Sequence, residues 1–170
     1  NFLEGNDIIR YIYLIMFKKI NIAVIGATGY TGLDLINLLS KHPKVNIKNL
    51  CATKNLGKKI SYFDKRIKKK LPKITSINDI DWKKLDLVFL SLPNGEAQKI
   101  IKKTYYKFDK LKYIDLSADF RIKNPKIYKK NYGINHKAND LIKNSIYSIA
   151  EFNKSKIRNF RIISNPGCYP

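Results

Sequence analysis

Cysteine, methionine and tryptophan are scarce in this chain of 170 residues, which contains two, one and one of them. Two cysteines without a secretory signal favour reduced thiols over a disulfide framework. Cys51, Cys168, His42 and His136 lie far apart in sequence without metal-ligand spacing, so we expect no metal site. The apolar segment 8–17 contains an arginine and is shorter than the about 20 residues that span a bilayer. We therefore expect no membrane association and a cytoplasmic location.

Acidic residues are also few, since 13 of them face 34 lysines and arginines, for a formal net charge of +21. Such a charge can indicate a polyanion partner. Only five of the basic residues are arginines, however, whereas proteins that read nucleic acids rely on arginine for bidentate contacts. The lysines are spread along the chain, and their densest run, residues 65–73, is typical of a solvated surface. We expect no nucleic-acid partner, and a nucleotide- or nucleic-acid-binding domain without catalysis remains the alternative of another class.

Glycine is scarce too, with eight residues, yet three of them follow one short apolar run, residues 20–25. After Gly26, Gly29 and Gly32 an apolar helical pattern begins at Leu33, which predicts a strand, a tight turn and a helix. Such a turn lets a phosphate approach the helix amides. The spacing G-x-x-G-x-x-G is not the best-known dinucleotide fingerprint, so a purely structural turn is the alternative. The cofactor contacts expected in this turn are Gly26, Thr28, Gly29, Tyr30, Thr31 and Gly32.

A second apolar run, residues 45–52, completes a βαβ unit of about 30 residues. NAD sites usually place an acid about 20 residues beyond the glycines to bind the ribose hydroxyls, whereas NADP sites place neutral or basic groups there. Residues 53–59 contain no acid, and they begin with Thr53 and Lys54. We therefore favour NADP, bound by Thr53 and Lys54. Because lysine is so abundant, a chance lysine at this position is the alternative.

Strand and helix patterns continue to alternate along the chain. Residues 86–92 form a near-continuous apolar run, typical of a strand buried on both faces of a parallel sheet, and residues 96–103 resume a helical pattern. Residues 113–116, 145–149 and 160–164 predict further strands. We expect the α/β class, with a Rossmann-like, doubly wound, mostly parallel sheet whose loops line one crevice. Those loops, at the carboxyl ends of the strands, are residues 26–32, 53–58, 91–95 and 117–121.

Two polar, lysine-rich stretches, residues 55–81 and 122–144, carry little information. Turn signals stand at Leu71-Pro72 and Asn124-Pro125. We expect the first stretch to be an irregular connection, and in the second we expect turns at Tyr128, Tyr132 and Asn124-Pro125.

The two cysteines have different surroundings. Cys51 lies in an apolar strand pattern and is interpreted as a small buried hydrophobic residue. Cys168 follows Pro166-Gly167 in a loop after a strand. If a helix begins just past it, the helix dipole lowers the pKa of this thiol. From the loop alone, a nucleophile and a structural cysteine are equally supported.

Six motifs follow one another along the chain: residues 26–32, 92–95, 114–121, 132–133, 151–153 and 165–170. Together they resemble the N-acetyl-gamma-glutamyl-phosphate reductases, within the aspartate-semialdehyde-dehydrogenase-like group. The resemblance runs from about Met16 to the last residue. Ser-Ala-Asp-Phe-Arg and Asn-Pro-Gly-Cys-Tyr-Pro are specific strings, whereas the glycine turn is shared with many dehydrogenases. Asn94 stands where many members carry histidine, and Ala150 where proline or threonine is usual.

The resemblance implies an NADPH-dependent reductase of N-acetyl-gamma-glutamyl phosphate, which belongs to arginine biosynthesis. Cys168 would be the nucleophile, whose thiolate expels phosphate and forms a thioester that a hydride then reduces. Arg121 would grip the substrate phosphate, and a surface pair with Asp119 is the alternative. Neither His42 nor His136 matches the acid–base histidine of the family's second domain. Reduction of another acyl phosphate, aminoadipyl or aspartyl, is the runner-up.

Further contacts follow from the same resemblance. Pro93 and Asn94 would close the crevice near the nicotinamide ribose. Amide groups at Asn165 and Gly167 would face the substrate carbonyl. The substrate-binding set is Ser117, Arg121, Asn165 and Gly167.

The two ends predict the domain boundaries. Because Met16 is the only methionine, we expect residues 1–15 to be a non-native or disordered extension. Residues 16–164 would form the NADP-binding domain. Residues 165–170 would begin a second, α+β catalytic domain that is essentially missing, in a protein that forms homo-oligomers when complete.

Overall fold

The computed structural model describes residues 18–167. Seven strands and four α-helices occur in this part of the chain. The strands are β1 (Ile20–Ile25), β2 (Val45–Cys51), β3 (Ile74–Thr75), β4 (Leu87–Leu90), β5 (Lys112–Asp115), β6 (Ser145–Tyr147) and β7 (Ile162–Ser164). The helices are α2 (Tyr30–Lys41), α3 (Glu96–Thr104), α4 (Pro125–Tyr132) and α5 (Lys154–Ile157).

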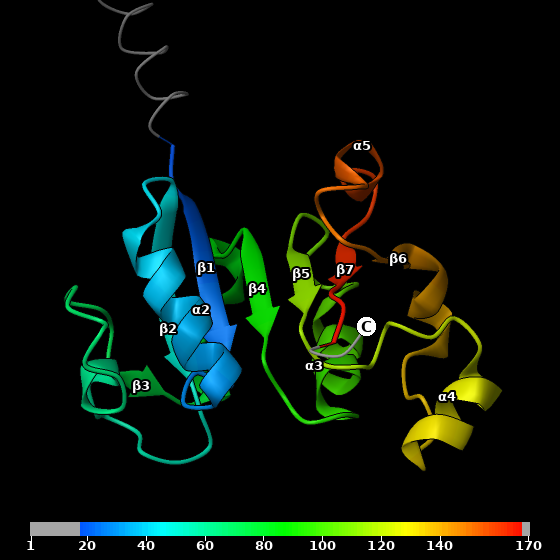
Figure 1. The fold of residues 1–170 in the computed structure, drawn as a ribbon, viewed down its shortest axis with the longest axis horizontal. Coiled ribbons are helices and arrows are strands. Elements are labelled where there is room, and N and C mark those ends of the chain that lie inside the picture. Colours follow the sequence, from blue (N-terminus) through cyan, green and yellow to red (C-terminus); the bar gives the residue numbers. More distant parts are fainter. Residues whose placement is uncertain (1–17, 168–170) are drawn as a thin grey trace, which may run out of the picture.

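The strands form one sheet in the order β3-β2-β1-β4-β5-β7-β6, and each of the recorded pairings is parallel (Figure 1). Strand β1 pairs with β2 on one side and with β4 on the other. The chain thus winds outward from β1 in two directions. The expected open, parallel α/β sheet is confirmed.

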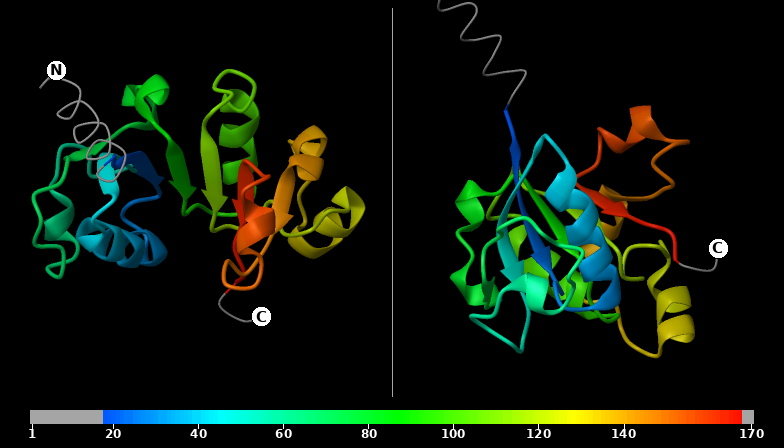
Figure 2. Two further views of the ribbon diagram at one scale, coloured as in Figure 1. Left: turned by 90° about the horizontal axis from the view of Figure 1, so that it is seen from above. Right: turned by 60° about the vertical axis from the view of Figure 1, so that its left-hand side comes forward.

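Both faces of the sheet are covered, which explains why the central strands β1 and β4 are almost entirely apolar. On β1, Ile22 and Val24 pack with α2, whereas Ala23 and Ile25 pack with α3, as the period of two along a strand requires. Seen from above, α2 and α3 lie on opposite sides of the sheet (Figure 2). The doubly wound arrangement predicted from the apolar runs is therefore confirmed.

Some element boundaries differ from the prediction. Helix α2 begins at Tyr30 rather than Leu33, because Gly29 already takes the cap position and the amide of Leu33 donates to the carbonyl of Gly29. Strand β3 lies in a stretch expected to be irregular. Its Ile74 is 1% exposed and pairs with Leu50 of β2, so two residues suffice for an edge strand.

Helix α4 is also absent from the prediction. The sequence predicts a turn at Asn124-Pro125, but the Asn124 side chain accepts hydrogen bonds from the amides of Lys126 and Ile127, and Pro125 takes the first helical position. This is a helix start signal, because proline there loses no hydrogen bond. Gly133, with φ of 71°, ends the helix.

Candidate functional site

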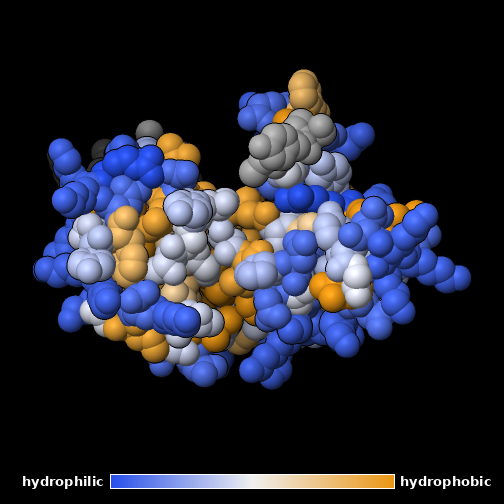
Figure 3. All heavy atoms as spheres, turned by 60° about the horizontal axis from the view of Figure 1, so that its bottom comes forward, coloured by the Kyte–Doolittle hydropathy of each residue, from blue (hydrophilic) through white to orange (hydrophobic). Residues whose placement is uncertain are grey.

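Since the strands are parallel, the loops that follow them meet at one edge of the sheet. The amide of Gly26 after β1 donates to Cys51 of β2, and the amide of Ser91 after β4 donates to Ile25 of β1. Among the strands on the other side of β4, the amide of Asn165 after β7 donates to Asp115 of β5. The surface at this edge is hollowed between the two halves of the molecule, with hydrophobic side chains along the hollow (Figure 3). The expected crevice is thus the meeting place of these loops.

The glycine turn after β1 depends on missing side chains at two of its three glycines. Gly26 has φ of +88°, and a Cβ there would lie 1.8 Å from the backbone oxygen of Ser91. A Cβ on Gly32 would lie 2.3 Å from the oxygen of Gly26. At Gly29, by contrast, a Cβ would meet only the oxygen of Gly26, at an ordinary 3.6 Å. Gly26 and Gly32 are therefore fixed by the fold, whereas Gly29 borders open space.

The N-terminus of α2 offers unpaired donors to that open space. The first amides of an α-helix have no acceptor within the helix. Gly29 provides no side-chain cap, and the first turn contains no acid. Tyr30 and Thr31 are exposed and Thr28 is half-buried. The residues predicted to bind a pyrophosphate thus surround a helix end with free positive potential.

The end of β2 carries the residues predicted to distinguish the cofactors. Thr53 and Lys54 are exposed. The next residue, Asn55, takes a left-handed conformation with φ of 64°, and its side-chain oxygen accepts a 3.0 Å hydrogen bond from Lys58. The ammonium of Lys58 lies 5.2 Å from the ring centre of Tyr62. Residues 53–58 of this turn include Lys54 and Lys58 and no acid.

The loop after β4 lies on the other side of the glycine turn. Pro93 and Asn94 are exposed. Gly95 has φ of +92°, and a Cβ there would lie 2.7 Å from a methyl group of Ile134. The loop is therefore packed on one side and open where the two predicted contacts lie.

The loop after β5 is organised by a buried carboxylate. Asp115 accepts hydrogen bonds from the amide and the hydroxyl of Ser117 at 2.9 and 2.5 Å, and from the amide of Phe120 at 3.1 Å. Burial raises the pKa of the Asp115 carboxyl, and the hydrogen bonds from Ser117 oppose this shift. The Ser117 hydroxyl also accepts from the amide of Asp119. Ser117, predicted to contact substrate, is 6% exposed, and its hydroxyl forms hydrogen bonds within the loop.

Arg121 lies against the segment that follows β7. Its Nε donates to the carbonyl of Asn165 at 2.8 Å, and its terminal nitrogen donates to the carbonyl of Leu116 at 3.2 Å. A Cβ on Gly167 would lie 2.9 Å from the guanidinium. The structure thus brings together three predicted substrate residues, Arg121, Asn165 and Gly167. Asp119 has other partners, so the alternative of a surface ion pair with Arg121 does not occur.

The two cysteines are not equally accessible. Cys51 is buried, its sulfur lies 3.8 Å from the Thr75 hydroxyl, and burial raises the pKa of its thiol to about 11. This matches its interpretation as a small buried residue. Cys168, predicted as the nucleophile, lies outside the described residues.

Sequence reasoning missed a buried polar cluster beside Arg121, made of Gln98, Asp119, Tyr128 and His136. Asp119 is 0% exposed and accepts from the Tyr128 hydroxyl at 2.7 Å. The amide of Ala138 donates to His136 Nδ1, so Nε2 carries the proton and donates to the Asp119 carbonyl at 2.8 Å. An acid between alanine and phenylalanine in Ser-Ala-Asp-Phe was the available signal, because a charge in apolar surroundings needs partners.

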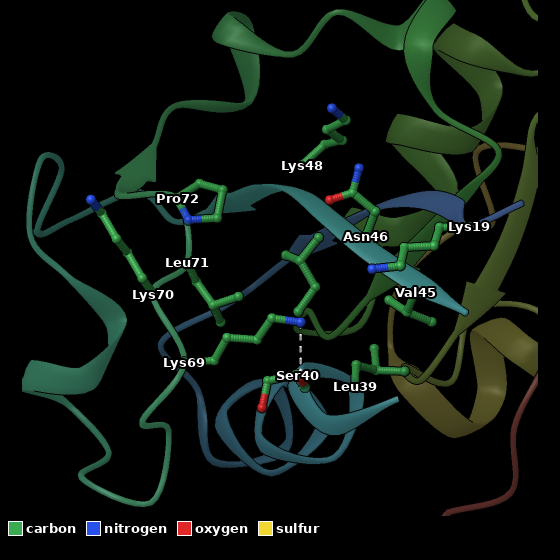
Figure 4. Close-up of a pocket in the computed structure, with 11 residues that line it drawn as sticks. Lys19, Leu39, Ser40, Val45, Asn46, Lys48, Lys69, Lys70, Leu71 and Pro72 are labelled. Atoms are coloured by element: carbon green, nitrogen blue, oxygen red, sulfur yellow. Dashed lines mark hydrogen bonds between the residues drawn. The ribbon is translucent and has the colours of Figure 1, made fainter. Parts of the chain in front are cut away.

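A pocket of about 370 Å³ lies at the opposite edge of the sheet (Figure 4). Lys19 before β1, Asn46 and Lys48 of β2, and Lys69 contribute to its lining. The ammonium of Lys69 donates to the carbonyl of Ser40 at the end of α2, at 3.2 Å. Since these residues lie near strand starts, the pocket is separate from the loop crevice.

Within residues 18–167, no three histidine, cysteine or acidic side chains gather as a metal site would require. No helix in this part of the chain combines the length and apolar character of a membrane span.

Comparison with known proteins identifies the fold family. Residues 21–160 match the family described as the NAD-binding domain of semialdehyde dehydrogenases. The chain belongs to this family. The glycine turn, the free α2 terminus and the parallel sheet are therefore the parts of a nicotinamide-cofactor domain.

Curated relatives of this NAD-binding domain carry a more specific name. N-acetyl-gamma-glutamyl-phosphate reductase of Ehrlichia canis is 46% identical over 91% of the chain, and that of Afipia carboxidovorans is 40% identical over 91%. The chain spans only 44% and 45% of the length of these relatives.

Solved structures share the fold of this NAD-binding domain. Aspartate semialdehyde dehydrogenase II of Vibrio cholerae superposes with a TM-score of 0.60 at 19% identity, over 89% of the chain and 39% of that protein. The NADP complex of the Candida albicans aspartate semialdehyde dehydrogenase gives 0.52 at 18% identity, over 86% of the chain and 42% of that protein.

Proposed function

We propose that this chain is the NADPH-binding part of a reductase that converts N-acetyl-gamma-glutamyl phosphate to the semialdehyde and releases phosphate. The observation that carries the proposal is the uncapped N-terminus of α2 beside the glycine turn, in a chain 46% identical over 91% of its length to a protein of that name. Residues 16–164 would form the cofactor domain. Residues 165–170 would begin the domain that completes the substrate site.

The choice of NADPH over NADH rests on the turn after β2. The extra phosphate of NADPH sits on the adenosine ribose, where NAD-binding proteins place an acid. Here Thr53 and Lys54 are exposed, and Lys58 is held nearby by Asn55. A cation near this phosphate favours NADPH, because opposite charges attract across a short distance.

The proposed chemistry assigns one role to each half of the crevice. Cys168 would attack the acyl carbon, the bond from that carbon to phosphate would break, and a thioester would form. A nicotinamide held in the crevice would supply the hydride that reduces the thioester. The Cys168 thiolate would then leave as the aldehyde forms, which regenerates the cysteine. Arg121 lies beside Asn165 and Gly167, so its guanidinium would bind the phosphate next to the nucleophile.

Titration calorimetry of the 170-residue chain with NADPH and NADH tests the cofactor assignment. We expect NADPH to bind at least about tenfold more tightly, a difference of about 1.4 kcal/mol. Lys54→Glu should weaken NADPH binding by about tenfold or more and change NADH binding little, because a like charge then faces the phosphate. Lys19→Glu, with the same charge change at the opposite edge, should leave both affinities unchanged.

Two results would argue against the proposal in different ways. If neither cofactor binds, the assignment of this chain as a cofactor-binding domain is wrong. Equal affinity for NADPH and NADH would overturn only the claim that the turn after β2 selects the extra phosphate of NADPH. For the complete protein, Cys168→Ser should abolish turnover and spare NADPH binding, and turnover by that variant would exclude Cys168 as the nucleophile.

A further inference from the structure

Asp119 is a buried acid whose polar atoms all have partners. One carboxylate oxygen accepts from the amide of Gly95 at 2.7 Å and from the hydroxyl of Tyr128 at 2.7 Å, and the other accepts from the amide of Gln98 at 2.9 Å. The Asp119 amide donates to Ser117, and its carbonyl accepts from His136. Through Gly95 and Gln98 the Asp119 carboxylate connects the loop after β5 with the loop after β4.

These contacts tie together two loops that carry predicted site residues. Gly95 directly follows Asn94, which is predicted to lie near the nicotinamide ribose. Asp119 itself precedes Arg121 by two residues, and Arg121 contacts Asn165. One carboxylate thus fixes the distance between the cofactor side and the substrate side of the crevice.

The carboxylate also occupies the N-terminus of α3. Gly95 and Gln98 supply cap and first-turn amides of this helix, which has no cap from its own N-cap side chain. A negative charge at this position is stabilised by the helix dipole and by charge-assisted hydrogen bonds. An isolated buried charge would be costly, so the loop can hold Asp119 only while α3 keeps this position. The position of the loop and that of the helix are therefore coupled.

We propose that Asp119 is a positioning residue of the proposed reductase site, because its carboxylate holds the loop that carries Asn94 in register with the loop that carries Arg121. This inference rests on the proposed function. Asp119 does not touch the cofactor or the substrate. It acts through the amides of Gly95 and Gln98, and Tyr128 supports it from α4.

The test separates the nicotinamide end of the cofactor from its adenosine end. In the proposed site NADPH would reach both ends of the crevice, whereas adenosine 2′,5′-bisphosphate would reach only the side formed by α2 and the turn after β2. In the 170-residue chain we expect Asp119→Asn to weaken NADPH binding about tenfold, because its amide group would face the donor of Gln98. Binding of adenosine 2′,5′-bisphosphate should change less than about twofold.

Two tyrosine variants provide the matched comparison. Tyr128 and Tyr113 are both fully buried, and each donates its hydroxyl to a side chain: Tyr128 to Asp119, and Tyr113 to Thr104 at 2.9 Å. Tyr128→Phe should weaken NADPH binding about threefold, whereas Tyr113→Phe should leave it unchanged. Tyr128→Phe loses the hydrogen bond to Asp119 and the one that its hydroxyl accepts from Gln98 at 3.2 Å, and Tyr113→Phe loses the one to Thr104, each worth about 1 kcal/mol. Should Asp119→Asn fail to fold, the difference between these two variants decides.

The outcomes are distinct. Equal weakening of both ligands in folded Asp119→Asn or Tyr128→Phe would show a general loss of structure and overturn the inference. Unchanged NADPH binding in both folded variants would overturn it as well. Failure of the unsubstituted chain to bind NADPH would instead overturn the proposed function and the inference with it.

Discussion

The N-termini of α2 and α3 lie at the same edge of one sheet, yet only that of α3 is capped by a side chain. Helix α2 follows a glycine turn, has no side-chain cap and has no acid in its first turn. Helix α3 also begins after a glycine, but the buried carboxylate of Asp119 accepts from its cap and first-turn amides. Helix amides attract anions in both cases. The protein supplies its own anion to α3 and leaves α2 free for one from solution.

This difference supports the site proposed for the cofactor phosphate. Two uncapped helix ends in one crevice would compete for the same negative group. With α3 already neutralised, the positive potential is concentrated at Gly29 and Tyr30, next to the turn that carries Lys54. The turn after β1 is therefore fixed by glycines that leave no room for a side chain, whereas the loop after β5 is fixed by the buried carboxylate of Asp119.

The largest expected effect comes from filling the glycine turn. Gly26→Ala would place a Cβ 1.8 Å from the Ser91 oxygen, at a φ of +88° that alanine rarely adopts. We expect a loss of about 4 kcal/mol or more in the free energy of unfolding, measured by urea denaturation, since backbone atoms cannot move aside cheaply.

Gly29→Ala is the control for the same turn. Its Cβ would meet only an ordinary 3.6 Å contact, and φ of −75° suits alanine. We expect it to cost about 1 kcal/mol or less in stability while weakening NADPH binding about tenfold, because the methyl group enters the space proposed for the pyrophosphate. A large loss of stability at Gly29, or none at Gly26, would contradict the assignment of the two glycines.

A smaller effect is expected from the loop after β5, which the buried carboxylate of Asp115 organises. Asp115→Asn would turn an NH2 group toward either the donors of Ser117 or the amide of Phe120, and we expect a loss of about 2–3 kcal/mol by urea denaturation. Exposed Asp109→Asn removes the same charge and should change stability by less than about 0.5 kcal/mol. Equal effects at both positions would mean that the loop does not depend on its buried carboxylate.

The glycine turn after β1 and the loop after β5 also differ in how well the sequence predicts them. Strand β1, the glycine turn and the two-sided burial of the sheet follow from local patterns, because a run such as Ile20–Ile25 and its glycines act on near neighbours. Asp119 could not be assigned, since its partners Gly95 and Tyr128 come from elements that only the tertiary fold brings together. Helix α4 could have been predicted, because Asn124-Pro125 is a helix start as well as a turn signal.

Stability should fall at acidic pH because of the buried His136, which follows α4 and contacts the Asp119 carbonyl. Burial lowers the pKa of His136, while the carbonyl of Asp119 and the charges of Asp119 and Asp140 oppose this shift and Lys102 adds to it. The unfolded chain then binds a proton more readily than the folded one, so stability is present above about pH 6.5 and is lost as the pH falls below it. We expect a loss smaller than that at Asp115.

Thermal unfolding between pH 7.5 and 5.5 measures this dependence. His136→Gln keeps a donor toward the Asp119 carbonyl and should flatten the profile. His42→Gln, at the exposed end of α2, should leave it as in the unsubstituted chain. A profile that His136→Gln does not change would assign the pH dependence to other groups.

The smallest effect separates the two reasons for which the first half of the molecule uses glycine. Gly57, in the turn after β2, has φ of +79° but no atom within 4 Å of the place where a Cβ would stand. Gly57→Ala thus tests backbone conformation without crowding, and we expect a cost of about 1 kcal/mol by urea denaturation. The difference between this value and that of Gly26→Ala measures the steric part at Gly26. Equal costs at the two positions would show that close approach to Ser91 contributes nothing, and that the glycine turn is held by its backbone angles alone.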